Sequence, residues 1–220
     1  MNTPKDLAIF DLDGTLISGQ SQMLFVQYAQ KKGLVPTTGY LKLSIGFLLY
    51  TLGIKKDPKS LMELGLSFFK NKPITELDTL IKLFFQDILV PQLNLSVIDM
   101  LKKHRAKGTD IILVSNAIYP IVKIVGEYLR IDHILCTQVH SNSDRFSGTI
   151  DGELMYGVNK LIAVKKFIEE GGEMYKKTWV YADHQSDIPL LEWSSDAVAV
   201  NPDGTLLKTA RRKNWQIITT

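Results

Sequence analysis

Short apolar runs alternate with amphipathic stretches along most of this chain. The apolar runs are typical of buried strands, because each is short and ends at a turn signal. These runs are Leu7–Asp11, Asp110–Ser115, His133–Thr137, Thr178–Ala182 and Asp196–Val200. Between most of them, apolar residues recur at i, i+3 and i+4, as on one face of a helix. Helices of this kind are predicted over Val97–Lys107, Ile118–Leu129 and Leu161–Glu169. The alternation predicts an α/β fold, with a parallel sheet flanked by helices.

Residues 18–89 interrupt this alternation. They contain no convincing strand pattern, and proline and glycine separate a series of helical stretches. The predicted helices are Met23–Lys32, Tyr40–Leu52, Ser60–Lys70 and Ile74–Ile88. We therefore predict that residues 1–17 and 90–220 form an α/β core and that residues 18–89 form a helical cap domain. A cap inserted directly after the first strand would lie over the carboxyl edge of the sheet and could exclude water.

A short antiparallel ribbon is predicted next to the third strand. Its two strands, Thr137–His140 and Phe146–Ile150, alternate weakly between apolar and polar residues. The polar loop 141–144 joins them.

The charge balance argues against a nucleic-acid partner. The chain has 220 residues, of which 45% are hydrophobic and 22% charged, and its net charge is +3. These values are typical of a soluble globular protein. The basic residues are scattered until a late cluster, which we interpret as the solvated face of a last helix. The cluster consists of Lys208, Arg211, Arg212 and Lys213.

Cysteine use and hydropathy favour a cytoplasmic location. The single cysteine, Cys136, excludes an internal disulfide, and its apolar neighbours predict a buried core residue. The first strand begins within ten residues of Met1, which leaves no room for a signal peptide. The most apolar stretch, Leu43–Leu52, is shorter than the ~20 residues that span a bilayer. We expect a monomer or homodimer in the cytoplasm with no membrane partner.

Asp11 and Asp13 are the first candidates for chemistry. They stand at the end of the first apolar run, and Gly14 and Thr15 follow at once. In open α/β sheets, ligands bind outside the carboxyl ends of the strands. Two carboxylates beside a glycine turn suit a hard cation and a nucleophile. The same Asp-x-Asp-Gly pattern also occurs in ordinary turns and calcium loops, so the pattern alone leaves both interpretations open.

Polar residues also follow the second strand and begin a later helix. Ser115 and Asn116 come at a predicted strand-to-helix turn, where they could bind phosphate or cap the helix. Lys160 stands at the start of a helix, with Asn159 as the expected cap. A lysine is electrostatically unfavourable there, because the helix N-terminus carries partial positive charge. A nearby anion would compensate it, whereas a solvated lysine is the alternative.

Two further aspartates complete an acidic cluster. Asp183 follows the strand that ends at Ala182, and Asp187 lies about one helical turn later. Together with Asp11 and Asp13 they place four carboxylates at one edge of one sheet. Their mutual repulsion predicts a bound divalent cation. Oxygen-only ligands favour Mg²⁺.

In this order the motifs resemble those of the haloacid dehalogenase superfamily of phosphatases. The motifs are residues 11–15, Ser115, Lys160 and the pair Asp183 and Asp187. The helical insertion after the first motif is similar to that of subfamily IB, which contains phosphoserine phosphatase. Residues 156–160, 187–192 and 200–203 also look like that subgroup. The resemblance covers nearly the whole chain, and it implies a Rossmann-like parallel sheet with a helical-bundle cap.

The resemblance also implies a reaction. Asp11 would be the nucleophile that forms an aspartyl phosphate, and Asp13 would be the general acid and then the general base. Mg²⁺ would be bound by Asp11, Asp183 and the backbone carbonyl of Asp13. The expected activity is a Mg²⁺-dependent phosphatase that hydrolyses a small-molecule phosphomonoester.

The remaining motif residues would bind the phosphate or support the site. By resemblance, Ser115 and Asn116 hold phosphate oxygens, and Lys160 stabilises their charge during catalysis. Asp187 and Thr15 support these groups from behind.

The sequence departs from the subgroup where the substrate is recognised. Phosphoserine phosphatases have a Glu shortly after the first motif and an Arg in the cap. Here the substrate candidate is Gln20, and no arginine precedes Arg105. Gln cannot pair with an ammonium group as a carboxylate does, and the cap has no guanidinium that could bind a carboxylate bidentately. We therefore expect a substrate other than phosphoserine. The lysines that could substitute as point charges are Lys42, Lys55 and Lys56.

Three other questions stay open at this stage. His184 follows Asp183 where the family often has Gly or Ser, and we interpret it as a supporting or exposed histidine. The Phe- and Leu-rich cap either packs its own helices or lines an apolar pocket. The alternatives to a phosphatase are a phosphotransferase of the same fold and a non-catalytic protein that binds a phosphate ligand.

Overall fold

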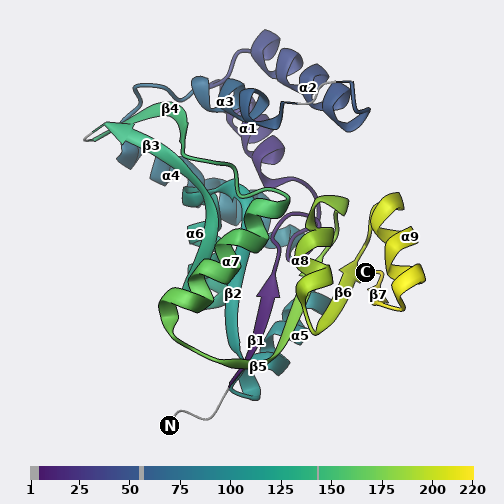
Figure 1. Cartoon of the computed structure of the whole chain (residues 1–220). Coiled ribbons are helices and arrows are strands. Elements are labelled where there is room, and N and C mark those ends of the chain that lie inside the picture. Colours follow the sequence, from purple (N-terminus) through teal and green to yellow (C-terminus); the bar gives the residue numbers. More distant parts are fainter. Residues whose placement is uncertain (1–4, 55–56, 143) are drawn as a thin grey trace.

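The computed structural model describes residues 5–54, 57–142 and 144–220. Its centre is a seven-stranded sheet in the order β4-β3-β2-β1-β5-β6-β7 (Figure 1). All neighbouring strands are parallel except β3 and β4. The strands are β1 (Lys5–Phe10), β2 (Asp110–Ile118), β3 (His133–Asn142), β4 (Arg145–Asp151), β5 (Tyr175–Ala182), β6 (Asp196–Val200) and β7 (Gln216–Ile218). The predicted α/β fold with a parallel sheet is confirmed.

The register of the central strands brings the candidate site residues to one edge of the sheet. Phe10 of β1 pairs with Leu113 of β2 on one side and Tyr181 of β5 on the other. The strands are parallel, so their carboxyl ends meet at one edge of the sheet. The residues that follow these pairs, among them Asp11 and Asp183, therefore share that edge.

Helices cover both faces of the sheet. Ala8 and Phe10 of β1 belong to one buried cluster, and Leu7 and Ile9 belong to a second cluster. This division follows from the period of two, which sends alternate side chains to opposite faces. The first cluster includes residues of α5 (Leu95–Ala106) and α6 (Tyr119–Leu129), and the second those of α7 (Val158–Gly171), α8 (Ile188–Trp193) and α9 (Gly204–Lys213).

The helices expected within residues 18–89 are present, with shifted ends. They are α1 (Ser21–Lys31), α2 (Thr37–Thr51), α3 (Pro58–Ser67) and α4 (Ile74–Phe84). The last helix does not continue regularly to Ile88, because a π-helical turn follows over Phe85–Leu89. The start of α3 is fixed by Asp57, whose side chain accepts a hydrogen bond from the Ser60 N–H at 3.0 Å.

The predicted antiparallel ribbon is confirmed, and it packs against these helices. Val139 of β3 pairs with Ile150 of β4. The Asn71 N–H donates to the Phe146 carbonyl at 2.8 Å, and the Phe146 N–H donates to the Lys72 carbonyl at 3.0 Å. Figure 1 shows the ribbon extending from the sheet to the region of α3 and α4. The ribbon therefore connects the helical insertion to the sheet through main-chain hydrogen bonds.

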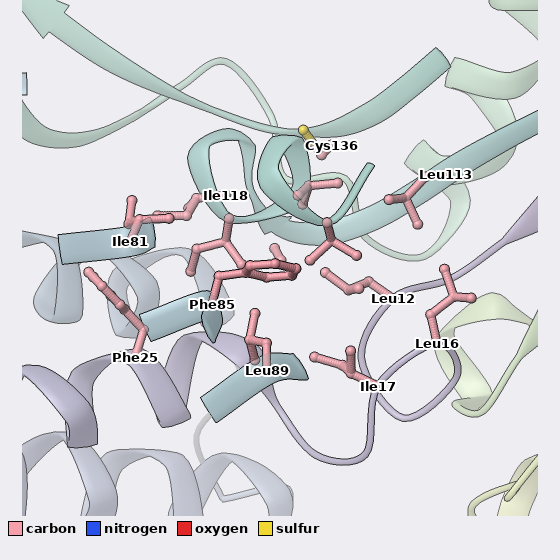
Figure 2. Close-up of a cluster of buried hydrophobic side chains, with 14 of the residues drawn as sticks. Leu12, Leu16, Ile17, Phe25, Ile81, Phe85, Leu89, Leu113, Ile118 and Cys136 are labelled. Atoms are coloured by element: carbon pink, nitrogen blue, oxygen red, sulfur yellow. The ribbon is translucent and has the colours of Figure 1, made fainter. Parts of the chain in front are cut away.

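Residues 18–89 also share a hydrophobic core with the sheet. Figure 2 shows Leu12 and Ile17 from the loop after β1 lying near Phe85 and Leu89, and Leu16 belongs to the same cluster. Burying several large aliphatic and aromatic side chains contributes about 1.5–3 kcal/mol for each. The division into core and cap domains stays a prediction, since this shared core joins the two segments.

Cys136 lies in the same core and is buried, as predicted. Burial raises the pKa of its thiol to about 12. The thiolate is therefore scarce at neutral pH, and Cys136 is not suited to be a nucleophile.

Some boundaries were predicted incorrectly. Strand β2 does not end at Ser115 but runs to Ile118. The cap of α7 is Gly157, with φ of +59°, and Asn159 lies inside the first turn. Strand β7 was not predicted, because three residues are too few to show alternation. Among the described residues, no helix combines the length and apolar character that a membrane crossing requires.

Candidate active site

Lys160 joins two aspartates at the carboxyl edge of the sheet. Its Nζ lies 2.7 Å from Asp11 Oδ1 and 2.9 Å from Asp187 Oδ1, and all three side chains are buried. Burial lowers the pKa of Lys160, but the two carboxylates outweigh that effect, and the net shift is upward. The lysine therefore stays protonated and supplies a fixed positive charge at this edge.

Gly14 lets the chain turn directly after Asp13, close to the side chain of Asp183. Its φ is +74°, in the region that favours glycine. A Cβ atom at this position would overlap the carboxylate of Asp183. The glycine is therefore required for two reasons, its backbone conformation and the close approach of Asp183.

Three carboxylates form a cluster that could hold a cation. Asp11, Asp183 and Asp187 each offer an oxygen, and these oxygens lie within 4.8 Å of one another. The prediction placed Asp187 behind the metal site and let Asp13 bind the metal through its backbone carbonyl, which the cluster of carboxylate oxygens does not test. The carboxylate of Asp13 is turned toward α1, where its Oδ1 accepts a hydrogen bond from the Ser21 N–H at 2.9 Å.

The electrostatics of this cluster favour a cation. Burial, together with Asp11 and Asp187, raises the pKa of Asp183 to about 9. Burial raises the pKa of Asp11 to about 7, although Lys160 opposes the shift. The raised pKa values mean that the cluster, once ionised, would carry more negative charge than Lys160 alone neutralises. The donor set contains only oxygen, which fits a hard divalent cation such as Mg²⁺.

Asp13 has the properties of a proton donor. Burial raises its pKa to about 6, and the hydrogen bond from Ser21 limits that rise. A carboxyl group with such a pKa exchanges its proton near neutral pH. It lies two residues beyond Asp11, on the same turn.

Ser115 and Asn116 lie beside the carboxylates, inside the extended end of β2. Ser115 is buried, and its Oγ accepts a hydrogen bond from the Ala117 N–H at 3.0 Å. Neither residue caps α6, because the residue before that helix is Ile118, so the capping alternative is wrong. Among the described residues the Ser115 hydroxyl donates no hydrogen bond, so its hydrogen is free for an anion.

A cavity of about 400 Å³ opens onto these groups. Its floor is the carboxyl edge of the sheet, with Asp11, Asp13, Ser115, Asn116, Lys160, Asp183 and Asp187. Its walls come from α1, α2 and α3. The volume lies within the range of about 300–1,000 Å³ of small-molecule sites.

The other candidate residues lie in the cavity, at its edge, below the site or away from it. Gln20 is exposed and lines the cavity, and half-exposed His184 lies at its edge, 3.5 Å from Asp203. Thr15 is buried below the site, and its carbonyl accepts a hydrogen bond from Asn94 at 3.1 Å. Lys42 is exposed and is not among the residues that line the cavity. The predicted substitutes at positions 55 and 56 lie outside the described residues.

Sequence reasoning missed four polar residues of the described cavity lining, namely Gln22, Tyr50, Tyr156 and Ser186. The hydroxyls of Tyr50 on α2 and Tyr156 before α7 are 3.0 Å apart. Gln22 on α1 donates from Nε2 to the Asn116 carbonyl at 3.5 Å. Tyr156 stands next to Gly157 in a motif that the sequence did show, whereas Tyr50 and Gln22 carry no local signal.

Replacing Gly14 with alanine is expected to abolish activity and to weaken Mg²⁺ binding at least about tenfold, because the new Cβ displaces Asp183. Gly33→Ala is the matched control, since Gly33 has the same kind of backbone conformation, with φ of +75°. A Cβ atom added there would have no neighbour within 4 Å. Titration calorimetry and phosphate release measure both effects. Equal losses in the two variants would show that backbone strain alone is responsible.

The metal-free protein is expected to lose stability as pH rises from about 4 to about 9. Asp11 and Asp183 have folded-state pKa values of about 7 and about 9, above the ordinary 3.8, so the folded state holds protons that the unfolded state has released. Mg²⁺ binds the ionised carboxylates, so its stabilising effect should grow with pH. Melting temperatures with EDTA and with Mg²⁺, measured across this range, test both statements. A Mg²⁺ effect that shrinks toward high pH would contradict them.

Comparison with known proteins identifies the family. The family of haloacid dehalogenase-like hydrolases matches residues 8–192. A histidinol-phosphatase of Neisseria meningitidis is 30% identical over 218 residues, which cover 97% of this chain and 98% of that protein. The chain therefore belongs to the haloacid dehalogenase-like hydrolase family, and the prediction of a hydrolase is confirmed.

Solved structures share the fold over the whole chain. A protein of unknown function from Bordetella pertussis Tohama I has a TM-score of 0.90 at 23% identity, covering 98% of this chain and 99% of its own. A substrate-bound phosphoserine phosphatase complex has a TM-score of 0.73 at 16% identity, covering 99% and 94%. At these identities the likeness concerns the fold. It agrees with the predicted sheet and its inserted helices.

Proposed function

We propose that this enzyme is a Mg²⁺-dependent phosphatase that hydrolyses a small-molecule phosphomonoester through an aspartyl phosphate on Asp11. The observation that carries the proposal is the buried arrangement of Lys160 between Asp11 and Asp187, at the floor of a cavity. Membership in the hydrolase family and the phosphatases among its curated relatives support the same reaction class.

In the first step, a carboxylate oxygen of Asp11 attacks phosphorus, and the bond from phosphorus to the ester oxygen breaks. Lys160 lies 2.7 Å from Asp11, where it favours the ionised nucleophile and offsets the charge of the phosphoryl oxygens. The Ser115 hydroxyl and the Asn116 amide, which line the same cavity, would donate to those oxygens. Asp13, whose pKa of about 6 keeps a fraction of it protonated near neutral pH, gives its proton to the leaving alkoxide.

In the second step, Asp13 is ionised and takes a proton from water. The water oxygen attacks phosphorus and the bond from phosphorus to Asp11 breaks, which releases phosphate and restores the carboxylate. One residue can serve both steps because its pKa of about 6 lies near the working pH.

Asp11, Asp183 and Asp187 would provide carboxylate oxygens for the cation. By the family resemblance, the backbone carbonyl of Asp13 would also bind it. When bound, Mg²⁺ supplies charge neutralisation at the phosphoryl oxygens. Asp187 also contacts Lys160, so it orients the lysine as well as adding negative charge.

We also propose that residues 18–89 act as the cap of this site. Helices α1 to α3 form the walls of the cavity above the sheet edge. The Ser21 backbone N–H donates to the Asp13 side-chain Oδ1, which connects the start of α1 to the proton donor. Such a cap excludes bulk water and restricts the substrate to small molecules, so we expect no nucleic-acid substrate.

A panel of phosphomonoesters tests the proposal. Phosphate release is measured with Mg²⁺ and with EDTA, and histidinol phosphate and phosphoserine are included because relatives are named for them. We expect release that requires Mg²⁺. Transfer of the phosphoryl group to an added alcohol in preference to water would favour a phosphotransferase. Binding of phosphate without any turnover would favour the non-catalytic alternative.

A further inference from the structure

We propose that the substrate of this site is a phosphomonoester whose alcohol carries an apolar, ring-sized group and no second anionic group. This inference rests on the proposed function for the phosphoryl end of the cavity. It concerns the other end, which is formed by α1, α2 and α3.

The walls of the cavity are apolar. Phe47 on α2 and Met62 on α3 are half-buried side chains that line it, beside the buried Leu43, Leu61 and Phe69. In the sequence, packing between the helices was one explanation for these residues, and an apolar pocket was the other. Their presence around one cavity that ends at Asp11 favours the pocket for Phe47 and Met62. An apolar group of the substrate would gain about 25 cal/mol for each Å² that it buries here.

The charges of the cavity are confined to its floor and edge. Among the described lining residues, the charged groups are the four aspartates and Lys160, with His184 as the only further group that can become cationic. Lys160 already forms ion pairs with the carboxylates of Asp11 and Asp187. As far as the described residues go, a carboxylate or second phosphate on the substrate would therefore enter the apolar part without a cation, next to an acidic cluster. Burying such an unpaired charge is strongly unfavourable.

The polar groups in the walls are neutral. Tyr50 and Tyr156 share one hydrogen bond between their hydroxyls, so one hydroxyl hydrogen remains available. Gln20 and Gln22 add amides at the side of α1. These groups can orient a hydroxyl or a ring nitrogen of the substrate, and they cannot neutralise an anion.

A matched pair of esters tests the inference on the unmodified enzyme. Benzyl phosphate and 4-carboxybenzyl phosphate differ by one carboxylate. We expect kcat/KM to be at least about tenfold higher for benzyl phosphate, because a site that leaves a buried charge unpaired discriminates against it. Equal values, or a preference for the carboxylated ester, would overturn the inference.

Phosphonates separate this inference from the proposed function. Benzylphosphonate and 4-carboxybenzylphosphonate bind without turnover, and titration calorimetry with Mg²⁺ measures their affinities. We expect the uncharged ring to bind at least about tenfold more tightly. That preference without hydrolysis of any ester would overturn the proposed function and leave the pocket chemistry supported. Hydrolysis of esters without the preference would overturn the inference alone.

Substitutions in the cavity walls test which residues produce the preference for an apolar, uncharged group. Phe47→Ala should lower the ratio of kcat/KM for benzyl phosphate over methyl phosphate about tenfold, and Ile45→Ala is the control, since Ile45 is 50% exposed on the same helix. Met62→Lys should shift the ratio of the matched esters about tenfold toward the carboxylated one. Melting curves establish that each variant is folded. An unchanged ratio in both folded pocket variants would overturn the assignment of this wall.

Discussion

Replacing Asp11 with asparagine is expected to lower kcat about 10⁴-fold or more, because an amide oxygen cannot form the covalent intermediate. The fold should be unaffected, since asparagine keeps the shape of the side chain and retains an oxygen for Lys160. The measurement is phosphate release under saturating substrate and Mg²⁺, with a melting curve of the same sample.

The control for this variant is Asp78→Asn, which makes the same chemical change at an exposed position of α4. It should retain the activity of the unmodified enzyme. Substantial turnover by Asp11→Asn would mean that water attacks the substrate directly, and the covalent mechanism would then be wrong.

Replacing Lys160 with methionine is expected to have the second largest effect. Without Mg²⁺ the variant leaves Asp11 and Asp187 buried with no cation between them, and breaking a buried pair of this kind costs about 3–5 kcal/mol. Protonation of the carboxylates should reduce that cost at low pH. The loss of a fixed charge beside the phosphoryl group should lower kcat about 10²–10³-fold.

Mg²⁺ should restore part of the stability of Lys160→Met, because it neutralises the negative charge of the same carboxylates. It should not restore activity. Lys166→Met is the matched control on the same helix, where an exposed lysine lies 3.6 Å from Glu170. That exposed pair is worth at most about 1 kcal/mol. Full activity in Lys160→Met would remove the lysine from the proposed mechanism.

The sequence was sufficient for the α/β fold because its signals were local. The apolar strands and the helical periodicity between them predict a parallel sheet, and the sheet edge then gathers residues that are far apart in the chain. Asp11 and Asp183 lie 172 positions apart, yet their strands are neighbours. The boundaries were less accurate where tertiary contacts decide them. Strand β2 continues beyond Ser115 because β3 pairs with it up to Ile118.

The candidate site was predicted in its composition but not in its contacts. The sequence indicated that Lys160 needs an anion, and only the structure shows that Asp187 is one of its two partners. The cluster of carboxylate oxygens contains Asp187 instead of Asp13 because the Asp13 side chain turns to the first N–H of α1. No local pattern reports such a side-chain orientation.

The wall of the cavity could not be derived from the sequence for a different reason. An apolar residue on a bundle helix has the same signature whether it packs between helices or faces a ligand. Tyr50 and Tyr156 are 106 positions apart, and their hydroxyl pair exists only because α2 lies above the loop that precedes α7. Such contacts depend on how the helical insertion docks on the sheet.

Phosphorylation of Asp11 during turnover tests the central claim most directly. The enzyme is mixed with its best substrate and Mg²⁺, quenched in acid within the first turnover, and digested for mass spectrometry. We predict one added phosphoryl group on the peptide that contains Asp11, and none in Asp11→Asn. A phosphoryl group on any other residue would contradict the account.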